Sequence, residues 1–185
     1  MTRSRTRLAL IGHSGAGKST TAQLITHAAD SRGLRCEVVK VAAPLYDLQH
    51  AFYTRLGRTL PPGQQDQQLM ETLALCLRDR DRDFLVRDFL ARAETSFADI
   101  VINDDVRSYN HDLPRLRDSG WTVIRVSAPA ETRKQRLADR GYLTLSDAST
   151  TGVEDVHVDI EITNDTTRQD LAVRARAALD QVFSC

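Results

Sequence analysis

The stretch Gly12-His13-Ser14-Gly15-Ala16-Gly17-Lys18-Ser19 matches the pattern G-x-x-x-x-G-K-[ST] at every position that the pattern specifies. Apolar residues 8–11 come directly before it and predict a strand, while residues 19–25 follow with the apolar spacing of a helix. A strand, a glycine-rich turn and a helix form the arrangement in which this pattern holds phosphate groups. We call residues 12–19 the phosphate loop.

The residue types of the phosphate loop account for this chemistry. Glycine adopts backbone angles closed to other residues, so consecutive N–H groups can converge on phosphate oxygens beside the positive end of the next helix. Lys18 is expected to face solvent and to reach the β- and γ-phosphates, and the Ser19 hydroxyl to ligate Mg²⁺. We expect no catalytic role for His13. The expected nucleotide-binding residues are Gly12, Ser14, Gly15, Ala16, Gly17, Lys18, Ser19 and Thr20.

Composition narrows the classes of partner. The chain of 185 residues is long enough for one domain, and its 25 basic and 25 acidic side chains give no net charge. No excess of positive charge points to a nucleic acid or an anionic membrane. Three scattered cysteines without C-x-x-C spacing, and an N-terminal apolar run too short for a signal peptide or a membrane span, fit a cytoplasmic protein. We expect a small-molecule partner, and a homodimer is compatible with the sequence.

Strand patterns alternate with helix patterns along the chain, which predicts a parallel sheet with helices on both faces. Ligands of such folds bind at the carboxyl ends of the strands. After the phosphate loop and its helix, the expected strands cover residues 36–42, 98–104, 121–126 and 158–162. The expected helices cover residues 45–56, 66–78, 82–97, 111–119, 131–140 and 168–182, and residues 58–65 form a loop.

Two acids, Asp104 and Asp105, stand where the strand over residues 98–104 should end. A carboxylate at that edge can hold Mg²⁺ opposite the phosphate loop, and the alternative is a strand end with two solvated acids. Because neighbours on a strand point to opposite faces, we expect only one of the two acids to face the metal. Arg107 follows closely and is suited to grip a substrate phosphate with its planar fork.

Arginines at positions 133, 136 and 140 share one face of the helix expected over residues 131–140. Such a row can neutralise a phosphoryl group in transit, and the alternative is pairing with Glu131 and Asp139. Arg87, in the helix expected over residues 82–97, either lines a substrate pocket or belongs to a solvated face.

Four segments together resemble the P-loop nucleoside monophosphate kinases. They are residues 12–20, residues 39–45, the strand ending in Asp105-Val106-Arg107, and residues 158–165 before the last helix. Among these kinases the chain looks most similar to the phage-type deoxynucleoside monophosphate kinases, with dephospho-CoA kinase as a relative.

The resemblance implies a single P-loop kinase domain over residues 1–185. Its fold would be three-layer α/β, with a five-stranded parallel sheet, helices on both faces and a short Arg-rich lid at about 130–152. Asp105 would serve the metal and the acceptor, Arg107 the acceptor phosphate, and Asn164 would lie near the nucleotide base. The catalytic residues implied are Lys18, Asp105, Arg107, Arg133, Arg136 and Arg140. Ala43 and Tyr46 replace an acid and a lysine of the family beside the acceptor site, where Tyr46 would contact the substrate.

These features predict ATP- and Mg²⁺-dependent phosphoryl transfer to a nucleoside monophosphate or a closely related small molecule. A kinase of a non-nucleotide metabolite, such as dephospho-CoA or a sugar, is an alternative that the changes at Ala43 and Tyr46 support. A nucleotide-dependent switch or binding module is a second alternative. The sequence holds no Asn-Lys-x-Asp segment for reading a base, which argues against the switch.

Overall fold

The computed structural model describes residues 5–61, 64–139 and 152–184, which fall into two compact units. We call residues 1–38 together with residues 96–185 the sheet unit, and Val39–Thr95 the helical unit. A single kinase domain over residues 1–185 stays a prediction. No helix in the described part of the chain combines the length and the apolar character that a membrane span requires.

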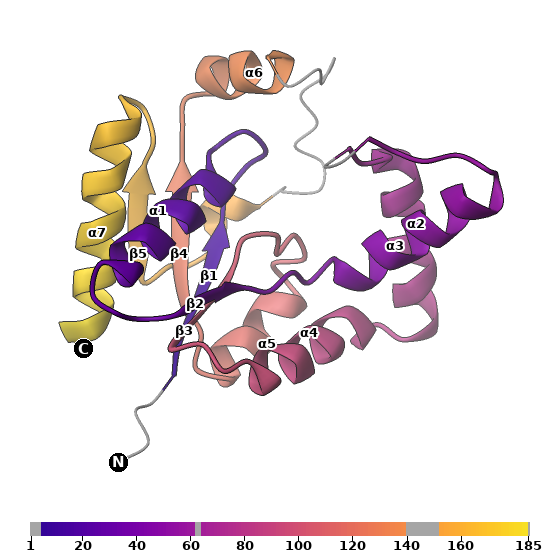
Figure 1. Ribbon diagram of the computed structural model, residues 1–185, viewed down its shortest axis with the longest axis horizontal. Helices are drawn as coiled ribbons and strands as arrows, with labels where there is room; N and C mark the ends of the chain where they lie inside the picture. The colour runs from indigo at the N-terminus through magenta and orange to yellow at the C-terminus, as the bar shows by residue number, and fades with distance from the viewer. Residues whose placement is uncertain (1–4, 62–63, 140–151, 185) are drawn as a thin grey trace. The chain divides into compact units, whose positions relative to one another are not determined.

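The sheet unit is built on five strands in the order β2-β3-β1-β4-β5, and every neighbouring pair runs parallel (Figure 1). This confirms the predicted five-stranded parallel sheet. Central β1 is the strand that leads into the phosphate loop, and its Leu8 lies opposite Ile102 of β3 and Thr122 of β4. The strands are β1 (Thr6–Ile11), β2 (Cys36–Val38), β3 (Ile100–Asn103), β4 (Thr122–Ser127) and β5 (Ile160–Thr163).

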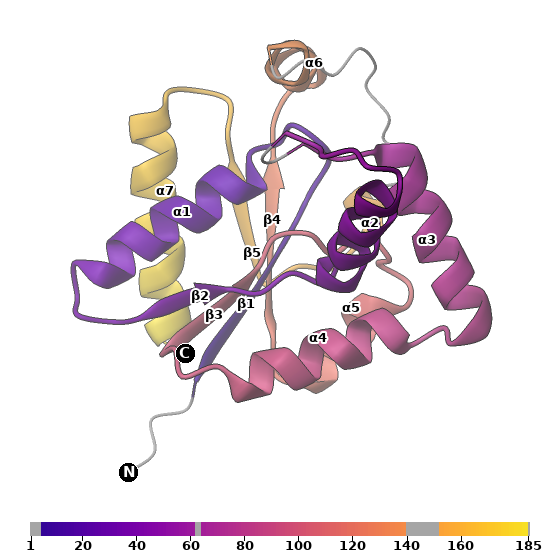
Figure 2. The same cartoon turned by 45° about the vertical axis from the view of Figure 1, so that its right-hand side comes forward.

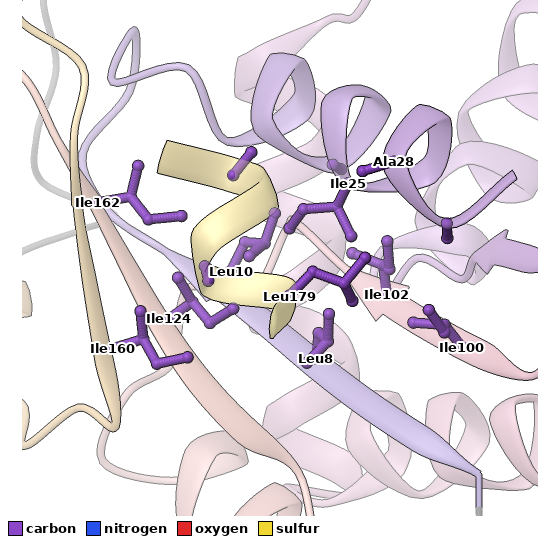
Figure 3. Packing of buried hydrophobic residues seen from close by; sticks show 14 of the residues in the cluster. Leu8, Leu10, Ile25, Ala28, Ile100, Ile102, Ile124, Ile160, Ile162 and Leu179 are labelled. Carbon is purple, nitrogen blue, oxygen red and sulfur yellow. The ribbon is translucent and has the colours of Figure 1, made fainter. Parts of the chain in front are cut away.

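Two helices, α1 (Lys18–Asp30) and α7 (Arg168–Ser184), cover one face of this sheet, and α5 (Asp112–Asp118) lies on the opposite side (Figure 2). Alternate strand residues such as Leu8 and Leu10 point toward α1 and α7, as the two-residue period of a strand requires. Figure 3 shows Leu179 of α7 packed among them with Ile25 of α1. The sheet unit also contains α6 (Ala130–Ala138) and a 3₁₀ turn, η2 (Val153–Asp155).

The helical unit consists of α2 (Ala43–Arg55), α3 (Gln67–Arg80) and α4 (Phe84–Thr95), each packed against the next. Pro44 stands in the first turn of α2, where its missing N–H costs nothing. Asp66 caps α3 by accepting a hydrogen bond of 3.0 Å from the Leu69 N–H.

Several strand ends differ from the sequence predictions by one to four residues, and two of these differences have a clear physical cause. The strand expected over residues 36–42 ends at Val38, because among the described strands β2 pairs with β3 alone, and β3 is four residues long. The strand expected over 98–104 ends at Asn103, whose side-chain oxygen accepts from the N–H groups of Asp105 and Val106 and so closes a turn. The turn η2 was not predicted.

Candidate active site

The backbone of the phosphate loop runs from the end of β1 to the start of α1, with three glycines at positive φ. A Cβ atom at Gly12 would lie 2.1 Å from the Val126 carbonyl oxygen, and one at Gly17 would lie 2.2 Å from the Asn164 amide nitrogen. At Gly15 the nearest atom would be the Arg133 carbonyl oxygen of α6, at 2.9 Å. Glycine is therefore required both by the turn and by the close packing of β4, α6 and the residue after β5 around the loop.

Lys18 folds back on the phosphate loop. Its ammonium donates to the carbonyl oxygens of Gly12 at 2.7 Å and His13 at 3.1 Å, and the residue is half-buried. The expectation that Lys18 faces solvent is therefore wrong, because two carbonyls at the start of the loop lie within reach of its three donors. Ser19 is exposed at the start of α1, and Thr20 beside it is partly buried.

Two arginines of α6 lie over the phosphate loop. Arg133 is 7% exposed and its Nη1 lies 3.4 Å from the Ser14 carbonyl oxygen. Arg136 reaches the Gly15 carbonyl oxygen at 3.5 Å and two oxygens of Asn164 at 3.2 and 3.3 Å. Arg133 and Arg136, which were predicted to share one helix face, thus both lie at the phosphate loop. Arg140 lies outside the described residues.

The acids proposed as alternative partners of these arginines have other partners nearby. Glu131 accepts from Lys134 at 2.7 Å, and Asp139 accepts from Gln135 at 2.8 Å. The structure places Arg133 and Arg136 against the phosphate loop, and their action on a phosphoryl group stays a prediction.

Asn164 holds the phosphate loop from the other side. Its buried amide donates to the Ala16 carbonyl oxygen at 2.8 Å, and its backbone N–H donates to the Ser127 carbonyl oxygen at 2.7 Å. The family resemblance implies that Asn164 lies near the nucleotide base, which stays a prediction, and in the structure its side chain braces the loop. Its neighbour Asp165 pairs with Arg174 at 2.7 Å, and that hydrogen bond lowers the pKa of the Asp165 carboxyl.

The acids after β3 occupy a turn. Asp104 is 4% exposed, whereas Asp105 is half-buried and accepts from the Asn103 side-chain amide at 2.7 Å. The argument from strand alternation is wrong here, because β3 ends at Asn103, before both acids. Asn103 pairs in register with Ala9 of β1, so the turn follows at the edge of the sheet where β1 leads into the phosphate loop. Arg107 is exposed.

Tyr46 and Arg87, predicted to bind substrate, belong to the helical unit. The Tyr46 hydroxyl accepts from Gln65 at 3.1 Å. Arg87 pairs with Asp81 at an exposed position, and this hydrogen bond lowers the pKa of the Asp81 carboxyl. Contact of either residue with a substrate stays a prediction.

A pocket of about 280 Å³ opens beside the phosphate loop, lined by Gly12, His13 and Ala16 of the loop and by the end of β4, Arg133 and η2. The His13 ring hydrogen-bonds the Glu154 carboxylate of η2. Burial would raise the pKa of Glu154, but this hydrogen bond and the charges of His13 and Arg125 bring it below the ordinary value. Sequence reasoning missed this pair, because 141 residues separate its members and neither position carries a local signal.

The residues that could hold Mg²⁺ are the Ser19 hydroxyl and the Asp105 carboxylate, both oxygen donors of the kind the ion prefers. Within the described residues, no group of three or more histidines, cysteines and acids could hold a metal by itself.

Comparisons with known proteins support the fold. A family model described as an AAA domain matches residues 2–91, and no curated protein sequence matches the chain. The Thermus thermophilus protein TT1252 is 20% identical with a TM-score of 0.61, over 96% of this chain and 97% of that one. A gluconokinase from Sinorhizobium meliloti is 17% identical with a TM-score of 0.55, over 97% and 94%.

An APS kinase from Mycobacterium tuberculosis, solved with AMPPNP and APS, is 16% identical to the chain. Its TM-score is 0.53, over 98% of this chain and 99% of that one. The fold is that of the P-loop kinases. At these identities the likeness establishes the shared fold, and the closer resemblance to phage-type deoxynucleoside monophosphate kinases stays a prediction.

Proposed function

We propose that the protein is an ATP- and Mg²⁺-dependent small-molecule kinase. The observation that carries the proposal is the convergence of three cations, Lys18, Arg133 and Arg136, on the carbonyls of a glycine-rich loop at the N-terminus of a helix. Positive charge held in place around a phosphate cradle is what phosphoryl transfer requires, since catalysis of this reaction is mostly positioning and charge stabilisation. The gluconokinase and the APS kinase that share the fold are named for this class of reaction.

Different residues of the site bind the nucleotide, the metal and the acceptor. The loop N–H groups and Lys18 bind the β- and γ-phosphates, so Lys18 exchanges its carbonyl partners for phosphate oxygens when the nucleotide binds. Ser19 and Asp105 hold the metal, which when bound neutralises charge on the phosphate oxygens. Arg133 and Arg136 stabilise the phosphoryl group in transit, and Arg107 orients the acceptor.

The sequence resemblance names a nucleoside monophosphate as the acceptor, on the strength of Asp105-Val106-Arg107. A non-nucleotide metabolite with a hydroxyl group is a second candidate. Its support is the replacement of the family's acid and lysine by Ala43 and Tyr46 beside the expected acceptor site.

The test is a screen for ADP release from ATP and Mg²⁺ across nucleoside monophosphates, nucleosides, dephospho-CoA and small sugars. One acceptor class should stimulate release, and the Lys18→Ala variant should abolish the stimulation. ATP binding without stimulation by any class would overturn the kinase proposal and favour a nucleotide-dependent switch.

A further inference from the structure

We propose that Glu154 and Arg125 are positioning residues, which act through His13 to hold the start of the phosphate loop in place for the nucleotide phosphates. The inference rests on the proposed kinase function and deepens it, because it gives a role in nucleotide binding to two residues outside the loop. Both residues act through other groups and not on the reacting atoms.

His13 connects the inside of the phosphate loop to its surroundings. Its backbone carbonyl oxygen accepts from the Lys18 ammonium at 3.1 Å and from the Ala16 N–H at 3.2 Å. Its ring hydrogen-bonds the Glu154 carboxylate of η2, and because an ionised carboxylate only accepts, the ring nitrogen Nε2 is the donor. A shift of the His13 ring would therefore also move the carbonyl that Lys18 and Ala16 share.

Arg125 of β4 fixes the turn that carries Glu154. Its Nη1 donates to the carbonyl oxygens of Val153 at 2.9 Å, Glu154 at 3.0 Å and Val156 at 3.1 Å. Its Nε donates at 2.7 Å to the carboxylate of Glu161, its partner in register on β5. Only 17% of the Arg125 side chain is exposed. One covered guanidinium thus ties η2 to two strands of the sheet.

These contacts close a ring around the start of the phosphate loop. Arg125 pairs in register with Ile11, the last residue of β1 before the loop. The connection runs along the chain from Ile11 to His13, crosses to Glu154, and returns through Arg125 to the strand beside Ile11. A loop that is held in this way before the nucleotide arrives loses less conformational freedom on binding.

Glu154 has two opposing effects on a bound nucleotide. Its negative charge repels phosphate groups, whereas its hydrogen bond to His13 holds the loop that binds them. The Glu154 side chain is 66% exposed, so water and salt screen its charge, while the His13 side chain that it holds is 20% exposed. We therefore expect the hydrogen bond to outweigh the repulsion.

The first experiment measures the binding of AMPPNP with Mg²⁺ by calorimetry. Glu154→Ala should raise the Kd about fivefold, the scale of one hydrogen bond. Glu154→Gln, whose amide oxygen still accepts from His13, should stay within about twofold of the wild type. Arg125→Lys keeps the charge but lacks the guanidinium that spans the η2 carbonyls, so it should weaken binding like Glu154→Ala. Because both residues act through His13, the double variant should bind no more weakly than the weaker single variant.

The second experiment follows amide hydrogen exchange in the protein without ligand. The Ala16 N–H donates to the His13 carbonyl oxygen, so it should exchange about fivefold faster in Glu154→Ala and at the wild-type rate in Glu154→Gln. The Trp121 N–H, which donates to the Leu116 carbonyl oxygen at 3.0 Å before β4 begins, should exchange equally in all three proteins. A wild type that does not bind AMPPNP would contradict the kinase proposal, and the exchange of Ala16 would still decide the role of Glu154.

Asp155→Ala is the matched control, because Asp155 is the neighbouring exposed acid of η2. It should change neither the Kd for AMPPNP nor the exchange of the Ala16 N–H. Tighter binding of AMPPNP by both Glu154→Ala and Glu154→Gln would show that repulsion outweighs the hydrogen bond. Unaltered exchange of the Ala16 N–H in a folded Glu154→Ala variant would show that the loop does not depend on Glu154. Either result would overturn the proposal.

Discussion

The glycines of the phosphate loop show how strongly close packing can restrict the residue type at a single position. Gly12 and Gly17 have neighbouring atoms so close that a methyl group would lie within 2.2 Å of protein oxygen or nitrogen. The same packing brings the side chains of Arg136 and Asn164 to the loop carbonyls. The loop is consequently shaped by its protein neighbours, which matches the need for a phosphate cradle that does not reorganise during the reaction.

Lys18→Ala should abolish phosphoryl transfer, with a loss of about a hundredfold or more in turnover, the cost of one charge-stabilising contact. Its two hydrogen bonds to loop carbonyls contribute a net of roughly 1 kcal/mol each, so the melting temperature should fall by only about 2–4 °C per bond. Turnover and ligand-free melting are measured together. Lys134→Ala, which removes an exposed partner of Glu131, is the control. Near-normal turnover of Lys18→Ala would contradict the assignment of the phosphate loop.

We expect Asp104 to contribute to the stability of the fold and Asp105 to contribute to the reaction. Asp104→Asn alters a residue that is 4% exposed, so it should cost about 1–3 kcal/mol of unfolding free energy. Asp105→Asn should instead lower Mg²⁺-dependent turnover about a hundredfold, with a smaller effect on stability. Urea unfolding and turnover at several Mg²⁺ concentrations test both variants. Equal losses of turnover would show that both acids reach the metal.

The number of residues between two contacting positions decides whether their contact could be predicted from the sequence. The phosphate loop is a contiguous stretch, so its strand, glycines and helix are legible without a structure. The hydrogen bond from Asn164 to Ala16 spans 148 residues, and the pair of His13 and Glu154 spans 141. Such contacts depend on how β5 and η2 are placed by the sheet, which no local pattern encodes.

Among the secondary-structure elements, those with strong local signals were placed well. The helix expected over residues 168–182 is α7, and that over 66–78 is α3, because apolar spacing marks both and Asp66 caps α3. The edge strand β2 is short because of its partner, not because of its own residues. Val39 and Val41 favour a strand by composition, yet they continue past the last pairing with β3.

The N-cap of α3 should make the stability of the protein sensitive to acid. The Leu69 N–H first, and then the Tyr53 hydroxyl, hydrogen-bond Asp66 and hold the pKa of its carboxyl below the ordinary 3.8. The folded state therefore favours the ionised form, so the stabilisation is present above about pH 4 and is lost as the pH falls through the lowered pKa.

Asp66→Ala should therefore cost about 1 kcal/mol at pH 7, the usual value of an N-cap, and less as the pH drops below 4. Urea unfolding of the variant and the wild type from pH 7 to pH 2.5 measures the difference. Glu71→Ala, which removes an exposed acid of the same helix, is the control. A difference that stays constant over this range would contradict the role of the Asp66 carboxylate.

The stability of the sheet unit depends on the apolar layer between the sheet and its two long helices, α1 and α7. Leu179 has no exposed surface and belongs to the cluster that joins α7 and α1 to the strands (Figure 3). Leu179→Ala should cost about 2–5 kcal/mol of unfolding free energy, because it removes buried methyl groups and leaves a cavity. Val173→Ala, at a position of α7 that is 66% exposed, should stay within about 0.5 kcal/mol. Equal effects in chemical unfolding would contradict the packing of α7.

The helical unit is one uninterrupted stretch, Val39–Thr95, inserted between β2 and β3. At its two borders the Ser96 hydroxyl donates to the Glu37 carboxylate, so the chain leaves and re-enters the sheet unit at neighbouring points. In genetic terms the unit is a cassette. Recombination at two sites, near codons 39 and 95, exchanges three helices at once while the codons for the phosphate loop, α6 and η2 stay in place. Natural divergence and directed evolution can therefore sample this stretch as a block.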